Sequence, residues 1–167
     1  MIYKPINEVD VNDLQSLIEN EVREGKTIEY KREMTIGKAD SEVVPFLKAV
    51  SSFANTVGGD LFIGIDVDKE NKDMPTALPG IVIDNLDTEK LRLENMLRDG
   101  LEPRLPSVNI QPIPLEDGKY VLMIRVQKSW VAPHRVKRND KFYARNSSGC
   151  YPLGHLWKPH LSDDMRG

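Results

Sequence analysis

The sequence has one cysteine, Cys150, no long apolar run and almost no excess of charge of either sign. A single thiol cannot form an internal disulfide or a cysteine-based zinc cluster, which favours a reducing, cytoplasmic location. The apolar runs are too short to span a bilayer, and the N-terminal segment MIYKPINEVD has no apolar signal region. Lys and Arg total 23 against 26 Asp and Glu, a net charge of -3. The overall charge therefore does not indicate a nucleic-acid partner, although it is compatible with a local basic patch.

At 167 residues, the chain has the length of one domain with at most a short tail. Hydrophobic residues make up 40% and charged residues 29% of it, fractions that exclude wholesale disorder and predict a soluble globular protein. A domain of this size buries enough apolar surface to fold without disulfide or metal cross-links. We expect residues 1–150 to form the domain and residues 151–167 to form an irregular C-terminal tail.

Apolar side chains recur at helical spacing in three stretches, which predicts helices over about 12–24, 41–56 and 88–100. Gly25 follows the first stretch at the place of a left-handed C-terminal cap. Asp87 precedes the third stretch and is a good N-cap.

Short apolar or alternating runs predict strands, and the continuous run at 61–65 reads as a strand buried on both faces. Asp117-Gly118 predicts the turn of a β-hairpin. The double glycine Gly58-Gly59 joins a helix to a strand and is expected to need a positive φ angle. Residues 69–79 should be an exposed loop, and the chain should be irregular from Asn146 onward. These signals predict an α+β fold, a single domain with helices packed on a mixed, partly antiparallel sheet, and strands at 27–31, 61–65, 108–115, 120–126 and 141–145.

Acidic residues near two of the predicted strands form one candidate site. Glu24 and Glu29 flank a short turn, and Asp66 follows the buried strand. Carboxylates on neighbouring strands can hold Mg²⁺ or Mn²⁺, and Lys31 can stabilise charge on a phosphate, which is the equipment of a metal-dependent phosphodiesterase. The alternative is a surface pair of Glu29 with Lys31 and an Asp66 that only begins a loop.

A second candidate site is the densest positive stretch of the chain. Asp140 is the only acidic residue between Lys128 and Leu161. Basic side chains can neutralise phosphates, and the interleaved Tyr143 can stack on a base. The alternative is a solvated hairpin whose aromatic side chains face the core. The basic residues expected to contact nucleic acid are Arg135, Lys137, Arg138, Lys141 and Arg145.

Gly25-Lys26-Thr27 superficially matches the end of a phosphate-binding loop. The full motif needs another glycine five residues before Gly25, where this sequence has Asn20. It also needs a strand before the loop and a helix after it, and the predicted order is the reverse. No ATP binding is expected.

Four segments also carry recognisable sequence elements. The most specific is Ser52–Asp66, which reads Ser-Phe-Ala-Asn-Thr-Val-Gly-Gly and then Leu-Phe-Ile-Gly-Ile-Asp. The other three are Glu24 with Glu29-Tyr30-Lys31, Leu93–Leu97 with Glu102-Pro103, and Phe142–Ser148. Together they resemble the Schlafen AlbA-like domain family, also called the divergent AAA-type domain, over roughly residues 10–150. The sequence departs from the family at Asn146, where the family often has Gly.

The resemblance implies an α+β fold with a mixed sheet that binds DNA or RNA. In Schlafen proteins two such domains in tandem form a clamp around RNA, and some cut it with three acids, which match Glu24, Glu29 and Asp66 here. Because this chain holds one domain, the resemblance also implies a homodimer. Our leading hypothesis is a cytoplasmic nucleic-acid-binding protein. The alternatives are a Mg²⁺- or Mn²⁺-dependent endoribonuclease using Glu24, Glu29, Lys31 and Asp66, and a non-enzymatic protein–protein interaction module.

Overall fold

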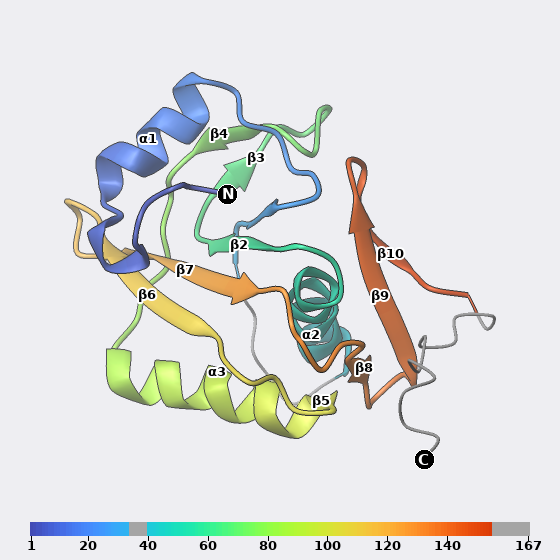
Figure 1. Cartoon of the computed structure of the whole chain (residues 1–167). Helices are drawn as coiled ribbons and strands as arrows, with labels where there is room; N and C mark the ends of the chain where they lie inside the picture. The colour runs from blue at the N-terminus through green and yellow to red at the C-terminus, as the bar shows by residue number, and fades with distance from the viewer. Residues whose placement is uncertain (34–39, 155–167) are drawn as a thin grey trace, which may run out of the picture.

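The computed structural model describes residues 1–33 and 40–154 of the chain. Its centre is a helix, α2 (Asp40–Ala54), that packs against strands of two separate four-stranded sheets. Figure 1 shows α2 between the first sheet and the β9–β10 hairpin. The predicted α+β class with a mixed sheet is confirmed.

The first sheet forms the body of the domain and has the strand order β1-β2-β7-β6. The strands β1 and β2 are parallel, and the other two pairs are antiparallel. Every residue of β2 is buried, as expected for an apolar central strand. The predicted hairpin is formed by the last two strands of the sheet. The bounds are β1 (Ile28–Lys31), β2 (Gly58–Ile63), β6 (Asn109–Pro114) and β7 (Tyr120–Gln127).

The second sheet is antiparallel throughout, with the order β10-β9-β8-β5. Its bounds are β5 (Leu101–Glu102), β8 (Arg135–Val136), β9 (Lys141–Asn146) and β10 (Gly149–Pro152). A separate two-stranded pair is made by β3 (Asp66–Val67) and β4 (Pro75–Ala77).

Two apolar cores lie on opposite faces of the first sheet. One joins α2, α3 (Leu86–Gly100) and the inner face of the second sheet, through side chains such as Phe53, Leu61 and Tyr143. The other lies under α1 (Val11–Glu19) and contains Leu14, Phe62 and Met123. A short 3-10 helix, η1 (Ile6–Glu8), precedes α1. Because side chains alternate between the two faces along β2 and β7, these strands contribute residues to both cores.

The first helix is shorter than predicted, since it ends at Glu19 rather than near Glu24. Asp10 begins it with a capping box that involves Asp13, and Glu21 takes a positive φ of 50° after the helix end. The chain is therefore already out of the helix when it reaches Gly25, and Gly25 is not the cap.

Two strands lie where the sequence predicts irregular structure. Within the predicted loop 69–79, β4 pairs with β3, and within the predicted tail, β10 pairs with β9. The predicted domain boundary at residue 150 therefore falls inside a strand, and the tail beyond residue 154 lies outside the described residues. No helix in the described part of the chain is long and apolar enough to cross a membrane.

Candidate functional site

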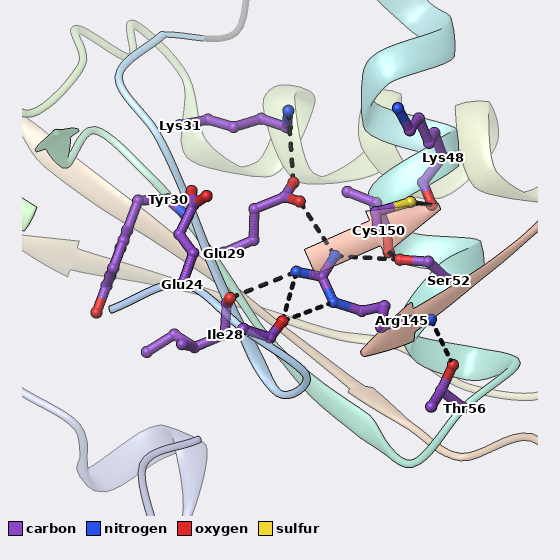
Figure 2. A network of polar contacts seen from close by, with 12 residues as sticks. Glu24, Ile28, Glu29, Tyr30, Lys31, Lys48, Ser52, Thr56, Arg145 and Cys150 are labelled. Atoms are coloured by element: carbon purple, nitrogen blue, oxygen red, sulfur yellow. Dashed lines mark hydrogen bonds and ion pairs between the residues drawn. The ribbon is translucent and has the colours of Figure 1, made fainter. Parts of the chain in front are cut away.

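Successive side chains of β1 point alternately into the core under α1 and toward α2. Ile28 and Tyr30 are buried in the core under α1, so Glu29 and Lys31 point to the opposite face, toward α2. There they line a cavity of about 400 Å³ together with Glu24. Figure 2 shows these side chains beside Lys48 of α2 and Cys150 of β10. The structure thus brings three of the four predicted catalytic residues to one pocket.

Glu29 is held by two cations. Its Oε1 atom accepts a hydrogen bond from Nη1 of Arg145 at 3.0 Å, and its Oε2 atom lies 3.5 Å from Nζ of Lys31. The Glu29 side chain is 13% exposed. Glu29 and Lys31 therefore form the ion pair that the alternative interpretation expects, but the pair lines a pocket instead of lying on an open surface.

Arg145 is fully buried and fastens β9 to the segment around β1 (Figure 2). Its guanidinium donates hydrogen bonds to the carbonyl oxygen of Gly25 at 3.1 and 2.8 Å and to Oγ of Ser52 at 3.2 Å. It also lies 4.1 Å from the centre of the Phe53 ring. The prediction that Arg145 contacts phosphates is therefore wrong, because its guanidinium N–H groups donate hydrogen bonds inside the protein.

Glu24 is the more chemically unusual of the two glutamates. Burial, together with the nearby charge of Glu29, raises the pKa of its carboxyl group to about 7, although a 2.8 Å hydrogen bond from the backbone N–H of Tyr30 and the charges of Arg145 and Lys31 act against the rise. A carboxyl group with such a pKa exchanges a proton near neutral pH, which is the property required of a general acid or base.

Asp66 does not join the pocket. It begins β3, and its Oδ2 atom lies 3.6 Å from Nη1 of Arg32. The chain turns at Gly64, whose φ is +108°, so Asp66 leaves the direction of β2. Among residues 1–33 and 40–154, no group of three or more His, Cys, Asp or Glu side chains could hold a metal ion. The described residues therefore do not assemble the predicted three-acid metal site.

The sequence reasoning missed Lys48, which lines the pocket from α2. Its Nζ atom lies 5.5 Å from the centre of the Tyr143 ring, a cation–π contact. The available signal was that Lys48 is the only basic residue between Ser41 and Thr56. Cys150 also lines the pocket, and burial raises the pKa of its thiol, which makes the thiolate scarce.

The residues of the predicted basic run differ in their exposure to solvent. Arg135 is ion-paired with Glu102 and Asp140. Tyr143 is buried, and its hydroxyl oxygen accepts a 2.6 Å hydrogen bond from the side-chain amide of Asn139. The members of the run that are exposed to solvent are Lys137, Arg138 and Lys141.

Comparisons with known proteins agree with this arrangement of elements. Residues 24–154 match the family described as "Schlafen, AlbA_2". A search of curated proteins gave no significant match.

Two solved structures are similar in fold. The N-terminal domain of an ATP-dependent DNA helicase RecG-related protein from Nitrosomonas europaea is 23% identical, with a TM-score of 0.57. That match covers 92% of this chain and 94% of the domain. The DIP2311 protein from Corynebacterium diphtheriae is 20% identical, with a TM-score of 0.50. Here the match covers 86% of this chain but 26% of the other, so this chain spans about a quarter of that protein.

Proposed function

Because this chain belongs to the Schlafen AlbA_2 family, we propose that it binds nucleic acid, either DNA or RNA. The observation that carries the proposal is an uneven distribution of charge. Although the whole chain has a net charge of -3, residues 118–139 contain no Asp or Glu. The basic residues of this stretch are Lys119, Arg125, Lys128, Arg135, Lys137 and Arg138.

Exposed basic side chains at the end of this stretch and at the start of β9 offer a surface for the phosphate backbone. Lys137 and Arg138 follow β8, and Lys141 begins β9. Each phosphate that a protein neutralises releases counterions, so binding through such residues weakens as salt rises. The similar RecG-related domain, which comes from a protein named as a DNA helicase, supports the same class of partner.

Binding can be measured by fluorescence anisotropy with labelled single-stranded and duplex DNA and RNA over a range of salt concentrations. We expect the triple variant Lys137→Ala, Arg138→Ala, Lys141→Ala to reduce the slope of log affinity against log salt by roughly 2–3. A matched control replaces Lys69 and Lys72 with Ala; both are exposed in the loop between β3 and β4. Figure 1 shows β3 and β4 well away from β8. No binding by the wild type, or equal slopes for both variants, would contradict the proposal.

A second candidate function is cleavage of the bound phosphodiester chain in the pocket. The observation that favours it is the convergence of Glu24, Glu29, Lys31 and Lys48 on one cavity. Glu24 can exchange a proton at neutral pH, and the two lysines bring positive charge to a phosphate. Because Asp66 lies elsewhere, the described donors do not fit a three-acid Mg²⁺ or Mn²⁺ site, and we assign no step to a metal ion.

Cleavage can be tested by incubating structured RNA with the wild type and three variants, in EDTA and in Mn²⁺. We expect Glu24→Gln and Glu29→Gln to abolish cleavage, and Asp66→Asn to retain it. Loss of activity in Asp66→Asn together with dependence on Mn²⁺ would restore the three-acid metal site. Intact RNA under all conditions would contradict cleavage, and nucleic-acid binding would then be the one proposed function that remains.

We also propose that the protein acts in the cytoplasm as a homodimer. The single cysteine supports the location. A second copy would supply the second set of exposed basic side chains that a clamp around nucleic acid needs. If neither nucleic acid nor self-association is found, the remaining alternative is a module that binds another protein.

A further inference from the structure

The loop between β7 and β8 carries Trp130, the one tryptophan among residues 1–33 and 40–154. The Trp130 side chain is 84% exposed. Indole is large and largely apolar, and its burial is usually among the main sources of binding energy at an interface. The described residues leave this side chain in solvent, although Val131 and Ser129 on either side are partly or fully buried.

The loop under Trp130 is fixed by a buried hydrogen-bonded pair. His134 is fully buried, and its Nδ1 atom lies 2.6 Å from the carbonyl oxygen of Pro103. Because that oxygen only accepts, Nδ1 carries the proton, and Nε2 accepts from the Ser129 hydroxyl at 2.7 Å. Ser129 Oγ in turn accepts from the backbone N–H of Val131 at 3.2 Å. These bonds hold both sides of the loop tip.

Backbone contacts attach the same loop to the end of α2. The N–H of Ser129 donates to the carbonyl oxygen of Ala54 at 2.9 Å, and the N–H of His134 donates to Oδ1 of Asn55 at 2.7 Å. Trp130 therefore projects from a rigid platform. Because the backbone of the loop is already held in place, binding does not have to order it, which lowers the cost of association.

The surroundings of Trp130 favour a negatively charged partner with flat faces. Lys128, two residues earlier, is exposed, and no acidic residue occurs between Gly118 and Asn139. Val57 adds a second apolar side chain that is 46% exposed. Its neighbour Gly58 pairs with Gln127 at the end of β7, so the two apolar groups flank the start of the loop.

We propose that Trp130 stacks on an unpaired base of single-stranded nucleic acid while Lys128 contacts an adjacent phosphate. This inference rests on the proposed nucleic-acid binding and adds the form that is bound. In a duplex the base faces are covered by their neighbours, whereas a single strand offers a free face to an aromatic ring. Stacking of this kind tolerates any base and adds to the phosphate contacts.

The test compares Trp130→Ala, Trp130→Phe and Trp130→Leu with the wild type, using labelled oligouridine, oligothymidine and a blunt-ended duplex without a loop. Loss of one stacked base should weaken single-strand binding of Trp130→Ala by roughly 5- to 150-fold and leave duplex binding unchanged. Phe keeps an aromatic face and should retain most of the affinity, whereas Leu keeps only apolar area and should behave like Ala. Tyr3→Ala, which removes a 95% exposed aromatic ring from the N-terminal segment, is the matched control.

A second measurement reports the contact directly. The only other tryptophan is Trp157, so a Trp157→Phe background leaves Trp130 as the single indole, and its fluorescence should be quenched as oligouridine is added. Wild-type binding that is unchanged in Trp130→Ala, with no quenching, overturns the inference and leaves the proposed function standing. Affinity retained by Leu as well as Phe also overturns it, because it indicates an apolar contact. A wild type that binds no nucleic acid overturns both.

Discussion

At the scale of single residues, Arg145 is held by five side-chain hydrogen bonds. Its guanidinium compensates the charge of Glu29 and satisfies the carbonyl oxygens of Gly25 and Ile28 from a fully buried position. Removing Arg145 takes away the hydrogen-bonded partner of Glu29 and leaves only Lys31, at 3.5 Å, beside a carboxylate that is 13% exposed. We therefore expect Arg145→Met to lower the free energy of unfolding by about 3–5 kcal/mol, measured by urea denaturation.

The control for this prediction is an arginine whose ion pair is exposed. Arg98 bonds to Asp99 on the surface of α3, and exposed pairs contribute about 0–1 kcal/mol. We expect Arg98→Met to have an unfolding free energy close to that of the wild type. Similar losses for the two variants would show that Arg145 is not a structural anchor.

The raised pKa of Glu24 predicts a specific dependence of stability on pH. Because burial raises the pKa from 4.5 to about 7, the folded protein binds a proton that the unfolded chain has already lost between these pH values. Stability from this group is therefore full below pH 4.5 and is lost as pH rises through 7. In Glu24→Gln, which stays neutral, this part of the fall should vanish.

The measurement is thermal unfolding of the wild type and Glu24→Gln between pH 4.5 and 8, supported by an NMR titration of the Glu24 side-chain carboxyl carbon. Glu19→Gln, an exposed change on α1, serves as the control. A Glu24 carboxyl that titrates near 4.5 would remove both the pH prediction and the support for Glu24 as a proton-transfer group.

At the scale of elements, the junction between α2 and β2 depends on close packing. Gly58 has a φ of +80°, as predicted for the double glycine, but Gly59 does not have a positive φ. A Cβ atom at Gly59 would instead lie 2.4 Å from the Phe53 ring and 2.6 Å from the carbonyl oxygen of Thr27. We expect Gly59→Ala to destabilise the protein by about 1–3 kcal/mol through overpacking.

Gly25→Ala is the comparison for Gly59→Ala. A Cβ atom at Gly25 would lie 3.5 Å from the Ser147 carbonyl oxygen, an ordinary van der Waals contact. Its effect on the unfolding free energy should stay within about 0.5 kcal/mol. Equal melting temperatures of the two variants would contradict the packing argument.

The longer helices and strands follow from the sequence, but β4, β10 and the faces of β9 do not. The alternation of side chains predicts the strand and puts Tyr143 and Arg145 on the same face of it. Because basic residues surround them in the sequence, that face is predicted to be exposed to solvent. In the structure that side packs against α2, with Tyr143 in the core. An arginine can be buried when its five donors all find acceptors, and those acceptors lie more than 90 residues away in sequence. A pattern in the sequence around Arg145 therefore cannot predict its acceptors or its burial.

For the whole molecule, the central helix explains how two sheets form one unit. The strands of the two sheets do not pair with each other, yet Val50 and Phe53 of α2 share one core with Leu61 of the first sheet and Val136 of the second. The pocket of Glu24, Glu29 and Lys48 lies between these parts, because β1, α2 and the β9–β10 hairpin all line it. Its geometry therefore depends on the complete fold rather than on any one element.

The last prediction concerns assembly. One copy exposes few basic side chains near β8 and β9, and an affinity built on few phosphate contacts is weak at physiological salt. Two linked copies bind with a second contact made at high effective concentration, which raises affinity without any new type of contact. We expect light scattering at tens of micromolar to give twice the chain mass of 19.0 kDa, and we expect the salt slope of binding to exceed that of one copy. A mass of one chain both with and without oligouridine would exclude the dimer and would require a single copy to bind alone.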